Sequence, residues 1–573
     1  MSFSSRLSIL MSAATTLVAS LGAAAEVGGS TTFIDQGWSK EIREQFYFTP
    51  QGSRIMPYAW FVGLETLDDK GMLADPANLE RYGFIRADGP HALNPGGLPI
   101  GFAVDPARTA SQSEGASAAV PSEAMLSRGQ QVGLTCSACH TANITVNGRA
   151  IRIDGAPARL DLDSFYADLS AAVDRTFFDI AAFQRFADRV LNDPSPAATA
   201  ELRLLFAEFQ ARLAGDAMIR HPTLASGFGR LDALTQSINS LAGVDQGDAR
   251  NLRAVNAPTS FPQLWLTPQL EFVQWSPIAA SPIGRNGGEV LAVFGAATLT
   301  GPPDGWLAST ILIKELQALE NWIADLKPPA WDEAIFGSVD RTLAMKGEAL
   351  FREHCASCHN SPPYRRTAPA DNAFGKTFIE IGRIDYRAVG TDPAYIRALE
   401  RRLVRTNAAT APVHAGAPVV TAAAYFLKTV GAIVKRAMKD AGIGDTEQLV
   451  LSGFRLRPPA TPGGQPTPYA PPAITDLKAG PLPGIWATGP FLHNGSVPTI
   501  YELLSPVNER RSVFWTGGRE LDHRQLGFES DERPDRFRFD TSLQGNQNTG
   551  HMYPREGLDN SQRMAIIEYL KFL

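Results

Sequence analysis

All four cysteines of this 573-residue chain lie in two short segments, each of which ends in a histidine. The segments read Cys136-Ser137-Ala138-Cys139-His140 and Cys355-Ala356-Ser357-Cys358-His359. Two thiols at the C-x-x-C spacing can form thioethers to the two vinyl groups of one porphyrin, and the next imidazole can then bind the iron. The pattern therefore predicts two covalently bound haems of type c.

Two disulfides or a zinc site are the alternative interpretations of the same cysteines. A redox-active C-x-x-C pair needs no following histidine, and a zinc site would have to bring both cysteine pairs together. Each segment instead ends in one of only 9 histidines in the chain. Haem attachment is therefore the favoured interpretation.

The first residues predict export of the protein. Arg6 is the only charge before an apolar stretch of small residues that ends in Ala23-Ala24-Ala25. This order is typical of a signal peptide, and serine and threonine interrupt the stretch too often for a membrane anchor. We expect a cleaved leader over residues 1–25, and a periplasmic or secreted protein with no membrane span once the leader is removed. No cysteine would be left unpaired in that oxidising compartment.

Composition excludes some partners and indicates the fold class. The formal net charge is −6, from 53 basic and 59 acidic side chains, so we expect no basic face for nucleic acid. The 41 prolines and 50 glycines indicate long irregular segments. We expect a mainly α protein with long irregular loops, built from two c-type cytochrome haem domains.

A weak internal repeat precedes the two motifs. Residues 125–134 and residues 344–351 both carry a basic residue followed by glycine, and both are predicted to be helices that lead into the motif. Pro328-Pro329 marks the boundary between the two units. We expect an N-terminal haem domain over residues 26–328 and a C-terminal cytochrome c domain over residues 329–573.

Apolar periodicity and turn residues predict the remaining organisation. Further helical regions are predicted over residues 161–190, 199–213, 315–326 and 561–573. Small polar residues predict a surface loop over residues 108–122, and nine prolines predict an irregular crossing segment over residues 458–483. We expect the last helix to pack against the helix that precedes the second motif.

Four further segments resemble one known family. They are Ile153-Asp154-Gly155-Ala156-Pro157, Gly229-Arg230-Leu231-Asp232-Ala233-Leu234, Arg285-Asn286-Gly287-Gly288-Glu289, and residues 484–499 with Phe491-Leu492-His493-Asn494-Gly495-Ser496. Together they resemble the bacterial di-haem cytochrome c peroxidase superfamily, and within it the longer branch that includes the haem-type rubber (latex) oxygenases. The resemblance implies a reactive haem in the N-terminal domain and an electron-transfer haem in the C-terminal domain.

The same resemblance implies the partners. Peroxide or dioxygen would be the oxidant, with an organic substrate in the oxygenase branch. An electron-donor cytochrome or a small copper protein would supply electrons. A calcium ion between the haem domains is common in the peroxidases, and the sequence locates no site for it here.

The axial ligands of the second haem follow only in part. His359 is the expected first ligand, and the position of the methionine ligand in the superfamily peroxidases falls on Val507, which cannot bind iron. The rubber oxygenases use two histidines at this haem, which favours His551 in a loop before the last helix. His493 is the alternative, as the ligand itself or as a residue that orients the ligand loop, and Met552 is the weakest choice.

The first haem, with His140 as its expected ligand, has no obvious sixth ligand. Only His91 and His221 remain in that half of the chain, and His221 lies far from the motif. An open iron that can bind dioxygen or peroxide is the more economical interpretation.

An aromatic stretch is expected to cover the open side of the first haem, as in the rubber oxygenases. It contains Trp265, Phe272 and Trp275, each of which could equally be a core residue. Peroxide cleavage calls for a general acid or base, and Glu289 or Glu271 could serve.

Three classes of function fit these observations. The first is a di-haem oxidoreductase, peroxidase-like or oxygenase-like, in which an open haem reacts with peroxide or dioxygen and a six-coordinate haem transfers electrons. The second is a non-catalytic periplasmic electron-transfer cytochrome, and the third is a haem-based sensor or binding protein. The first class differs in requiring a vacant coordination position on one iron.

We predict two covalent haems per chain. The denatured protein should keep its haem on gels, because thioether bonds survive unfolding, and the pyridine haemochrome assay should give two haems per chain. Replacing Cys136 and Cys139 by alanine should leave one. Retention of two haems by that variant would show that the attachment sites are assigned wrongly.

Overall fold

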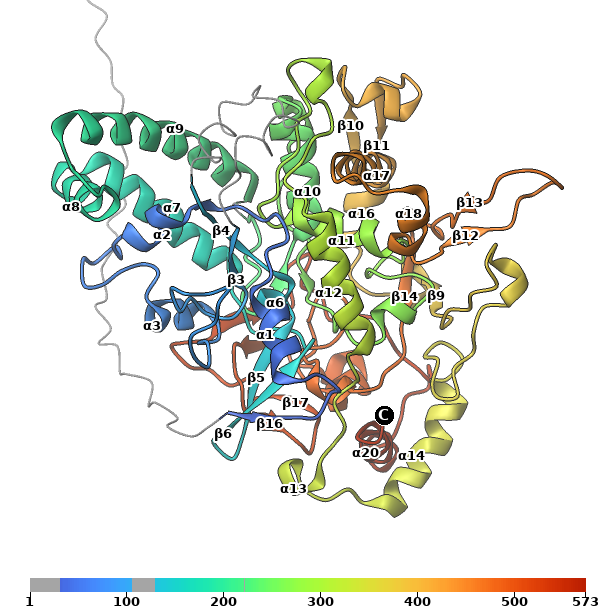
Figure 1. The fold of residues 1–573 in the computed structure, drawn as a ribbon. Coiled ribbons are helices and arrows are strands. Elements are labelled where there is room, and N and C mark those ends of the chain that lie inside the picture. Colours follow the sequence, from blue (N-terminus) through green and yellow to red (C-terminus); the bar gives the residue numbers. More distant parts are fainter. Residues whose placement is uncertain (1–30, 106–128, 221) are drawn as a thin grey trace, which may run out of the picture.

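The computed structural model describes residues 31–105, 129–220 and 222–573, and Figure 1 shows the arrangement of its elements. Mostly short helices and small sheets are joined by long loops. The predicted leader and the predicted loop over residues 108–122 lie outside the described residues. Within the described ranges, no helix has the length and apolar character needed to cross a bilayer.

Three helices form the part of the N-terminal half that lies farthest from the C-terminus in Figure 1: α7 (Leu162–Phe178), α8 (Ile180–Val190) and α9 (Pro196–Arg220). They confirm the helical regions predicted over residues 161–190 and 199–213. The first region is divided at Asp179, whose carboxylate accepts hydrogen bonds from the backbone N–H groups of Ala181 and Ala182. This side chain therefore caps the N-terminus of α8 and breaks the periodic segment into two helices.

The segment before the first motif is a strand, and the helix predicted there is wrong for the residues that the structure describes. Strand β4 (Gln131–Leu134) lies between β2 (Met56–Pro57) and β3 (Phe102–Asp105) in a three-stranded sheet. All four of its residues are buried. A β-carbon on Gly133 would lie 1.8 Å from the backbone oxygen of Ser53, so the strand packs tightly between neighbours. Hydrogen bonds from both sides of a central strand outweigh the weak local preference for helix.

A β-hairpin follows the first motif directly. The motif turn is α6 (Cys136–Cys139), and the hairpin consists of β5 (Thr141–Val146) and β6 (Arg149–Asp154), which pair antiparallel. Asn147 and Gly148 turn the chain with φ of 51° and 76°, the left-handed conformation that an Asn-Gly hairpin turn favours. Strand β1 (Thr32–Phe33) adds parallel to β6.

The helix predicted before the second motif is confirmed as α14 (Arg341–His354), and the terminal helix as α20 (Asn560–Leu570). The two helices pack together beside the C-terminus in Figure 1. Gly347 makes this close approach possible, since a β-carbon there would lie 1.9 Å from the carbonyl oxygen of Ala565. The helix predicted over residues 315–326 is confirmed as α12 (Ile313–Asp325).

The proline-rich segment over residues 458–483 is irregular for most of its length, but it ends in a strand. Strand β14 (Asp476–Ala479) pairs antiparallel with β9 (Gly382–Asp385), with Ala479 opposite Gly382. A β-carbon on Gly382 would lie 2.5 Å from the backbone oxygen of Cys358. The strand pair therefore lies directly against the second motif and fixes the position of the next residue, Gly480.

The remaining elements are short and connect these parts. The other helices are α1 (Lys40–Phe48), α2 (Tyr58–Gly63), α3 (Pro76–Leu79), α10 (Ala233–Ile238), α11 (Pro282–Ala292), α13 (Glu333–Phe336), α15 (Tyr386–Val389), α16 (Ala394–Glu400), α17 (Ala422–Asp440), α18 (Asp445–Leu451) and α19 (Ile500–Leu503). Two-stranded pairs are formed by β7 (Arg230–Leu231) with β8 (Thr259–Ser260), β10 (Leu403–Arg405) with β11 (Val419–Thr421), β12 (Leu456–Arg457) with β13 (Thr467–Pro468), β15 (Val513–Thr516) with β18 (Phe537–Asp540), and β16 (Leu521–Asp522) with β17 (Gly527–Phe528).

The largest apolar core crosses the predicted domain boundary. It contains Ile144 and Trp265 from the first half of the chain, and Trp486 and Ile567 from the second. Shared burial of this kind holds the two halves together. A second core, which contains Phe61, Phe102 and Phe165, lies within the first half alone. The boundary at residue 328 stays a prediction.

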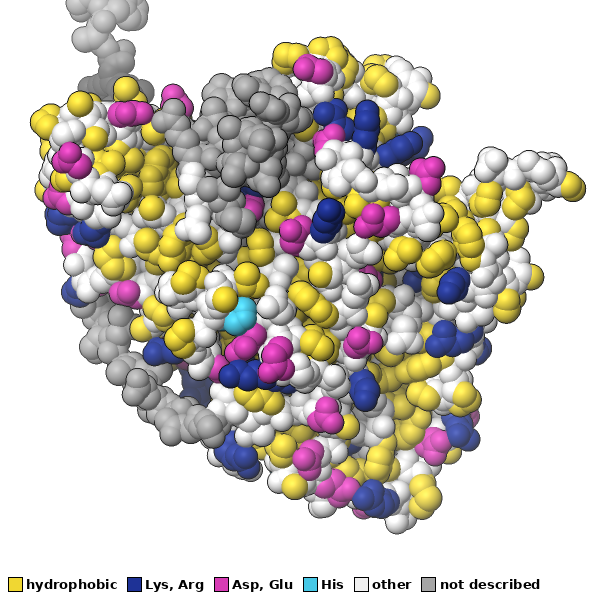
Figure 2. Space-filling view, in the orientation of Figure 1, with side chains coloured by type: hydrophobic (Ala, Val, Ile, Leu, Met, Phe, Trp, Pro, Cys, Tyr) yellow, Lys and Arg dark blue, Asp and Glu magenta, His cyan; other side chains and the backbone are white. Residues whose placement is uncertain are grey.

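The surface carries mixed charge. On the face drawn in Figure 2, Lys and Arg side chains are interspersed with Asp and Glu side chains. Among the described residues visible on that face, no patch of a single sign stands out, which agrees with the mildly acidic composition.

The helix contact at Gly347 can be tested through stability. Gly347→Ala should lower the free energy of unfolding by about 1–3 kcal/mol, because the new methyl group would push against the backbone of α20. Gly431→Ala is the matched control, since a β-carbon at this exposed position of α17 meets nothing within 4 Å. The control should gain about 0.5–1 kcal/mol from the higher helix propensity of alanine. Thermal unfolding of both variants would measure the difference, and equal effects would contradict the packing described.

Candidate haem-binding sites

The first motif is held in place by the end of α1. The side-chain hydroxyls of Thr135 and Ser137 each donate to the backbone oxygen of Tyr47 at 3.1 Å. The Cys136 thiol contacts the Gln51 side-chain oxygen at 3.0 Å. All four motif cysteines are free thiols. They are therefore available for attachment, and they do not form the alternative disulfides.

A distant backbone carbonyl orients the histidine of the first motif. The Nδ1 atom of His140 lies 2.8 Å from the carbonyl oxygen of Pro262, 122 residues along the chain. Burial lowers the pKa of His140 to about 4, so the ring is neutral at physiological pH. A neutral imidazole whose Nδ1 hydrogen bonds to a carbonyl presents Nε2 as a metal ligand.

The second motif repeats this geometry. The Nδ1 atom of His359 lies 2.9 Å from the carbonyl oxygen of Gly480, 121 residues along the chain. Burial lowers the pKa of His359 as well. The strand pair β9–β14 delivers this carbonyl, because Gly480 follows β14 directly.

His551 faces His359 across the second motif. The centres of the two imidazole rings are 6.1 Å apart, and the ring planes are inclined by 54°. Nitrogen ligands lie about 2 Å from a bound metal, and the ring centre lies about 1 Å beyond each nitrogen, so two histidines on one metal ion are expected about 6 Å apart. Burial, and then the neighbouring His359, lower the pKa of His551 to about 3, which leaves this ring neutral.

The cavity between these histidines has the chemistry that a haem requires. Apolar side chains such as Leu477, Phe491 and Leu503 line most of it, together with both motif cysteines. The hydroxyls of Ser260 and Thr391 and the Nδ1 atom of His551 line it as well, and each is buried without a hydrogen-bond partner. Apolar walls with a few unsatisfied polar atoms fit a porphyrin with polar propionate groups.

A partly buried lysine adds a positive charge to the same cavity. Lys478 lines it, and its ammonium lies 6.0 Å from the ring centre of Trp275. Burial, and then Arg285, lower the pKa of Lys478 to about 8. A negatively charged group of the cofactor would relieve this cost of burying the ammonium.

The other predicted ligands lie in different surroundings. His493 is 5% exposed and lines the cavity, with its ring centre 6.1 Å from that of Tyr395. The sulfur of Met552 accepts a contact from Arg510 at 3.8 Å. His354, for which no ligand role is predicted, lines the cavity from the end of α14, beside Cys355. Of the three predicted candidates for the sixth ligand, His551 is the one whose ring faces that of His359.

The structure separates the aromatic residues predicted to cover the first haem. Trp265 is buried between the two halves and donates from its indole N–H to the carbonyl oxygen of Pro483. Phe272 belongs to a separate apolar cluster with Ile379, 6.4 Å from the ring of Tyr469. Trp275 lines the cavity of the second motif. This placement differs from the predicted cover, because the stretch serves to join the halves and to hold His140 through Pro262.

Glu289 lies close enough to the first motif for its charge to act on both motif thiols. It is on α11, and its charge helps burial to raise the pKa of Cys139 to about 12. Burial raises the pKa of Glu289 itself, while Arg285 opposes the shift. The Gln274 side-chain N–H donates to the carboxylate at 2.9 Å. Glu289 is therefore a partly buried carboxyl group whose orientation is fixed by Gln274.

Glu271, the alternative acid or base, is turned elsewhere. Its carboxylate accepts the backbone N–H of Ile381 at 3.2 Å. It lines a pocket with Phe272 and Tyr469 that contains neither motif.

No second histidine faces His140 within residues 31–105, 129–220 and 222–573. His91 stacks on Phe48, with ring centres 5.4 Å apart, and accepts the backbone N–H of Leu93. His221 lies outside the described residues. The ring nearest to His140 is that of Phe261, 6.4 Å away.

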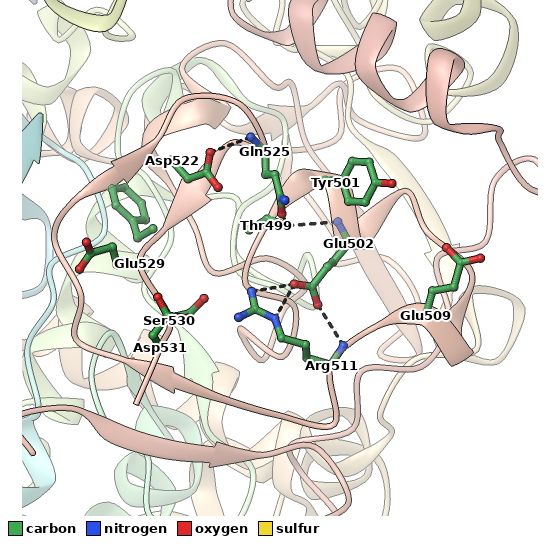
Figure 3. Close-up of a pocket in the computed structure, with 11 residues that line it drawn as sticks. Thr499, Tyr501, Glu502, Glu509, Arg511, Asp522, Gln525, Glu529, Ser530 and Asp531 are labelled. Atoms are coloured by element: carbon green, nitrogen blue, oxygen red, sulfur yellow. Dashed lines mark hydrogen bonds and ion pairs between the residues drawn. The ribbon is translucent and has the colours of Figure 1, made fainter. Parts of the chain in front are cut away.

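An acidic pocket in the C-terminal half is the natural place to look for calcium. It is lined by five carboxylates, as Figure 3 shows: Glu502, Glu509, Asp522, Glu529 and Asp531. Several already have arginine partners, such as Arg511 for Glu502 at 2.7 Å. In the part of the chain that is described, no group of three or more His, Cys, Asp or Glu side chains is arranged to hold a metal ion directly. Calcium stays a prediction without a located site.

Sequence reasoning missed the groups that orient the histidines. The carbonyls of Pro262 and Gly480 carry no side-chain signal, although Pro262 is itself a proline and Gly480 precedes Pro481. Asp392 was also missed. Its buried carboxylate accepts the N–H groups of Gly545 and Gln547 and so fixes the loop that leads to His551.

Comparison with known proteins agrees with this chemistry. Residues 477–516 match the family described as RoxA-like, cytochrome c-like, so the chain is a haem cytochrome related to the rubber oxygenases. The chain is 33% identical to the uncharacterized protein y4iJ of Sinorhizobium fredii, over 95% of this chain and 93% of y4iJ. It is 26% identical to the uncharacterized protein y4iM of the same organism, over 51% of this chain and 56% of y4iM.

The pairing of His359 with His551 can be tested directly. His551→Ala should convert the second haem from a closed, low-spin form to one that binds carbon monoxide, because a coordination position becomes vacant. His493→Ala is the control and should leave that haem closed. Optical titration of the reduced protein with carbon monoxide measures both. If only His493→Ala opens the site, the two assignments must be exchanged.

Proposed function

Because the chain belongs to the same family as y4iJ of Sinorhizobium fredii and contains a RoxA-like cytochrome c segment, we propose that it is an exported di-haem c-type cytochrome oxidoreductase. His140 would hold a first haem, whose iron would supply the reaction with peroxide or dioxygen. His359 and His551 would hold a second haem, which would supply electron transfer. We propose further that the protein belongs to the di-haem peroxidase superfamily, on the side of its oxygenase branch.

The asymmetry between the two motifs carries the proposal. His359 faces a second histidine at 6.1 Å between ring centres. Among the described residues, the nearest ring to His140 is instead that of Phe261. A haem with two histidine ligands is closed to oxidants and suits electron transfer, whereas a haem with one is open.

The matching supports of the two histidines favour two related haem modules. Each histidine is oriented by a carbonyl about one fifth of the chain downstream, at spacings of 122 and 121 residues. Two unrelated sites would not be expected to share this spacing. It supports the weak internal repeat, although a strand precedes the first motif and a helix the second.

The residues beside the first motif can handle a proton. When bound, haem c supplies an iron that binds an oxygen species and exchanges single electrons. Glu289 has a pKa raised by burial, so its carboxyl can hold a proton closer to neutral pH than an exposed glutamate. Gln274 fixes one carboxylate oxygen, and Arg285, the next charge on α11, limits the shift.

One short segment connects the two sites. Pro262 contributes the carbonyl that orients His140, and Ser260, Phe261, Pro262 and Gln263 line the cavity of the second motif. The Trp275 indole N–H donates to the Ser260 carbonyl in the same wall. Adjacent sites favour electron exchange between them, with an external cytochrome or small copper protein as the donor in the periplasm.

The non-catalytic electron-transfer cytochrome remains the second candidate. It requires both irons to be six-coordinate, and His221 lies outside the described residues. A haem-based sensor would bind a gas at one iron without turnover. A rapid reaction with an oxidant would distinguish the proposed enzyme from the electron-transfer cytochrome and from the sensor.

We expect the fully reduced protein to bind one carbon monoxide per two haems and to react rapidly with peroxide or dioxygen, because only the first haem is open. Fast turnover of peroxide with a cytochrome donor would assign a peroxidase. Oxygen uptake that depends on an added unsaturated hydrocarbon would assign an oxygenase. Absence of carbon monoxide binding and of any reaction would leave the electron carrier as the function.

A pair of glutamate variants sharpens this test. Glu289→Gln should slow the reaction with peroxide by about 10²–10⁴-fold, the usual contribution of a general acid or base, while carbon monoxide still binds. Glu271→Gln is the matched control and should react at the normal rate, since Glu271 lines a different pocket. Equal rates for both variants would exclude Glu289 from proton transfer.

A further inference from the structure

A buried arginine from the first half of the chain reaches the loop that carries His551. Arg230 on β7 is 2% exposed. One of its terminal nitrogens donates to the backbone oxygen of Asn494 at 3.0 Å and to the side-chain oxygen of Asn546 at 2.9 Å. Its Nε donates to the backbone oxygen of Ser226 at 2.8 Å, and the guanidinium lies 4.1 Å from the ring centre of Phe539.

The acceptors of Arg230 are neutral, which makes the position unusual. A guanidinium is costly to bury, and the usual compensation is a carboxylate partner. Here one terminal nitrogen contacts both the segment of Asn494 and the loop of Asn546, while Nε contacts Ser226, and a lysine ammonium could not match this spread of donors.

The same loop is fixed from two other sides. The Asp392 carboxylate accepts the N–H groups of Gly545 at 2.7 Å and Gln547 at 3.1 Å. The Asn494 side-chain amide donates to the backbone oxygens of the same two residues. Arg230 therefore holds Asn494, which in turn holds the loop, and also holds the loop directly through Asn546.

His551 depends on such support. Its φ is 55°, a left-handed conformation that is unfavourable for residues other than glycine, and its own N–H donates to the Val389 carbonyl. Strain of this kind costs about 1–3 kcal/mol and persists only where the surroundings fix the backbone. Without the anchors, the loop would relax and the ring would leave its position opposite His359.

The strand that carries Arg230 also helps to position the first motif. Arg230 pairs with Ser260 across β7 and β8. Two residues beyond Ser260, the Pro262 carbonyl orients His140. The Ser260 N–H donates to the backbone oxygen of His493, next to Asn494. One strand pair thus contacts the supports of both histidine sites.

We propose that Arg230 is a positioning residue for His551, so that the N-terminal half of the chain controls the sixth ligand of the second haem. The inference rests on the proposed function, in which His551 binds that iron. It extends the function by assigning a role to the Gly229-Arg230-Leu231-Asp232 segment, which lies outside both motifs.

The test compares Arg230→Met with Arg402→Met in the haem-loaded protein. Arg402 is a matched control, since it is also buried and donates to neutral oxygens of Asn239 and Asn251, away from the loop. Arg230→Met should raise carbon monoxide binding by about one molecule per chain over the unaltered protein and reduce the low-spin ferric signal, because the sixth ligand is released. Arg402→Met should leave both unchanged. Arg230→Lys should restore part of the low-spin signal.

A second variant tests the proposal if the Arg230→Met protein does not fold. Asn546→Ala removes one acceptor of Arg230 and leaves the buried charge in place, and it should release the ligand in a fraction of the molecules. A folded Arg230→Met protein with unchanged carbon monoxide binding and spectrum would overturn the proposal. If His551→Ala itself fails to open the second haem, the ligand assignment fails instead, which separates the two outcomes.

Discussion

The arrangement of this protein depends on the hydrogen bond between each motif histidine and a remote backbone carbonyl. The second nitrogen of a metal-binding imidazole is usually hydrogen-bonded, and this bond fixes the orientation of the ring. His140 obtains this contact from Pro262, and His359 from Gly480. Both carbonyls belong to loops, so the surrounding fold must place loop backbone to within a few tenths of an ångström. The β7–β8 and β9–β14 pairs next to these loops provide that precision.

This dependence explains how much the sequence could predict. Side chains at a fixed spacing can be recognised in a sequence. The sequence could therefore predict the two motifs, the helices α14 and α20, and the candidate His551. A carbonyl has the same chemistry at every residue, so Pro262 and Gly480 gave no signal. Strand β4 was missed for a related reason, since its pairing with β2 and β3 comes from residues far away in the chain.

The aromatic stretch shows that a resemblance alone is insufficient to assign side chains to a site. Trp265, Phe272 and Trp275 lie within eleven residues of one another, and yet the structure sends them into three different surroundings. The chain bends repeatedly here, with Leu266 and Gln274 both at positive φ. Side chains in such a segment do not share a face, so periodicity cannot assign them to one site. Glu289 lies on a regular helix instead, and its position beside the first motif was easier to anticipate.

The balance of energies around His551 indicates why the second site needs so many anchors. The left-handed backbone of His551 costs about 1–3 kcal/mol, and the buried neutral rings lose hydration as well. Each buried hydrogen bond returns only about 0.5–1.5 kcal/mol, so a single contact would not hold the loop. Asp392, Asn494, Ser496 and Arg230 together supply enough of them, from three separate segments of the chain. A ligand held against strain in this way can be released by a small change at any one anchor, and the anchor from the first half of the chain is the one that also adjoins the site of His140.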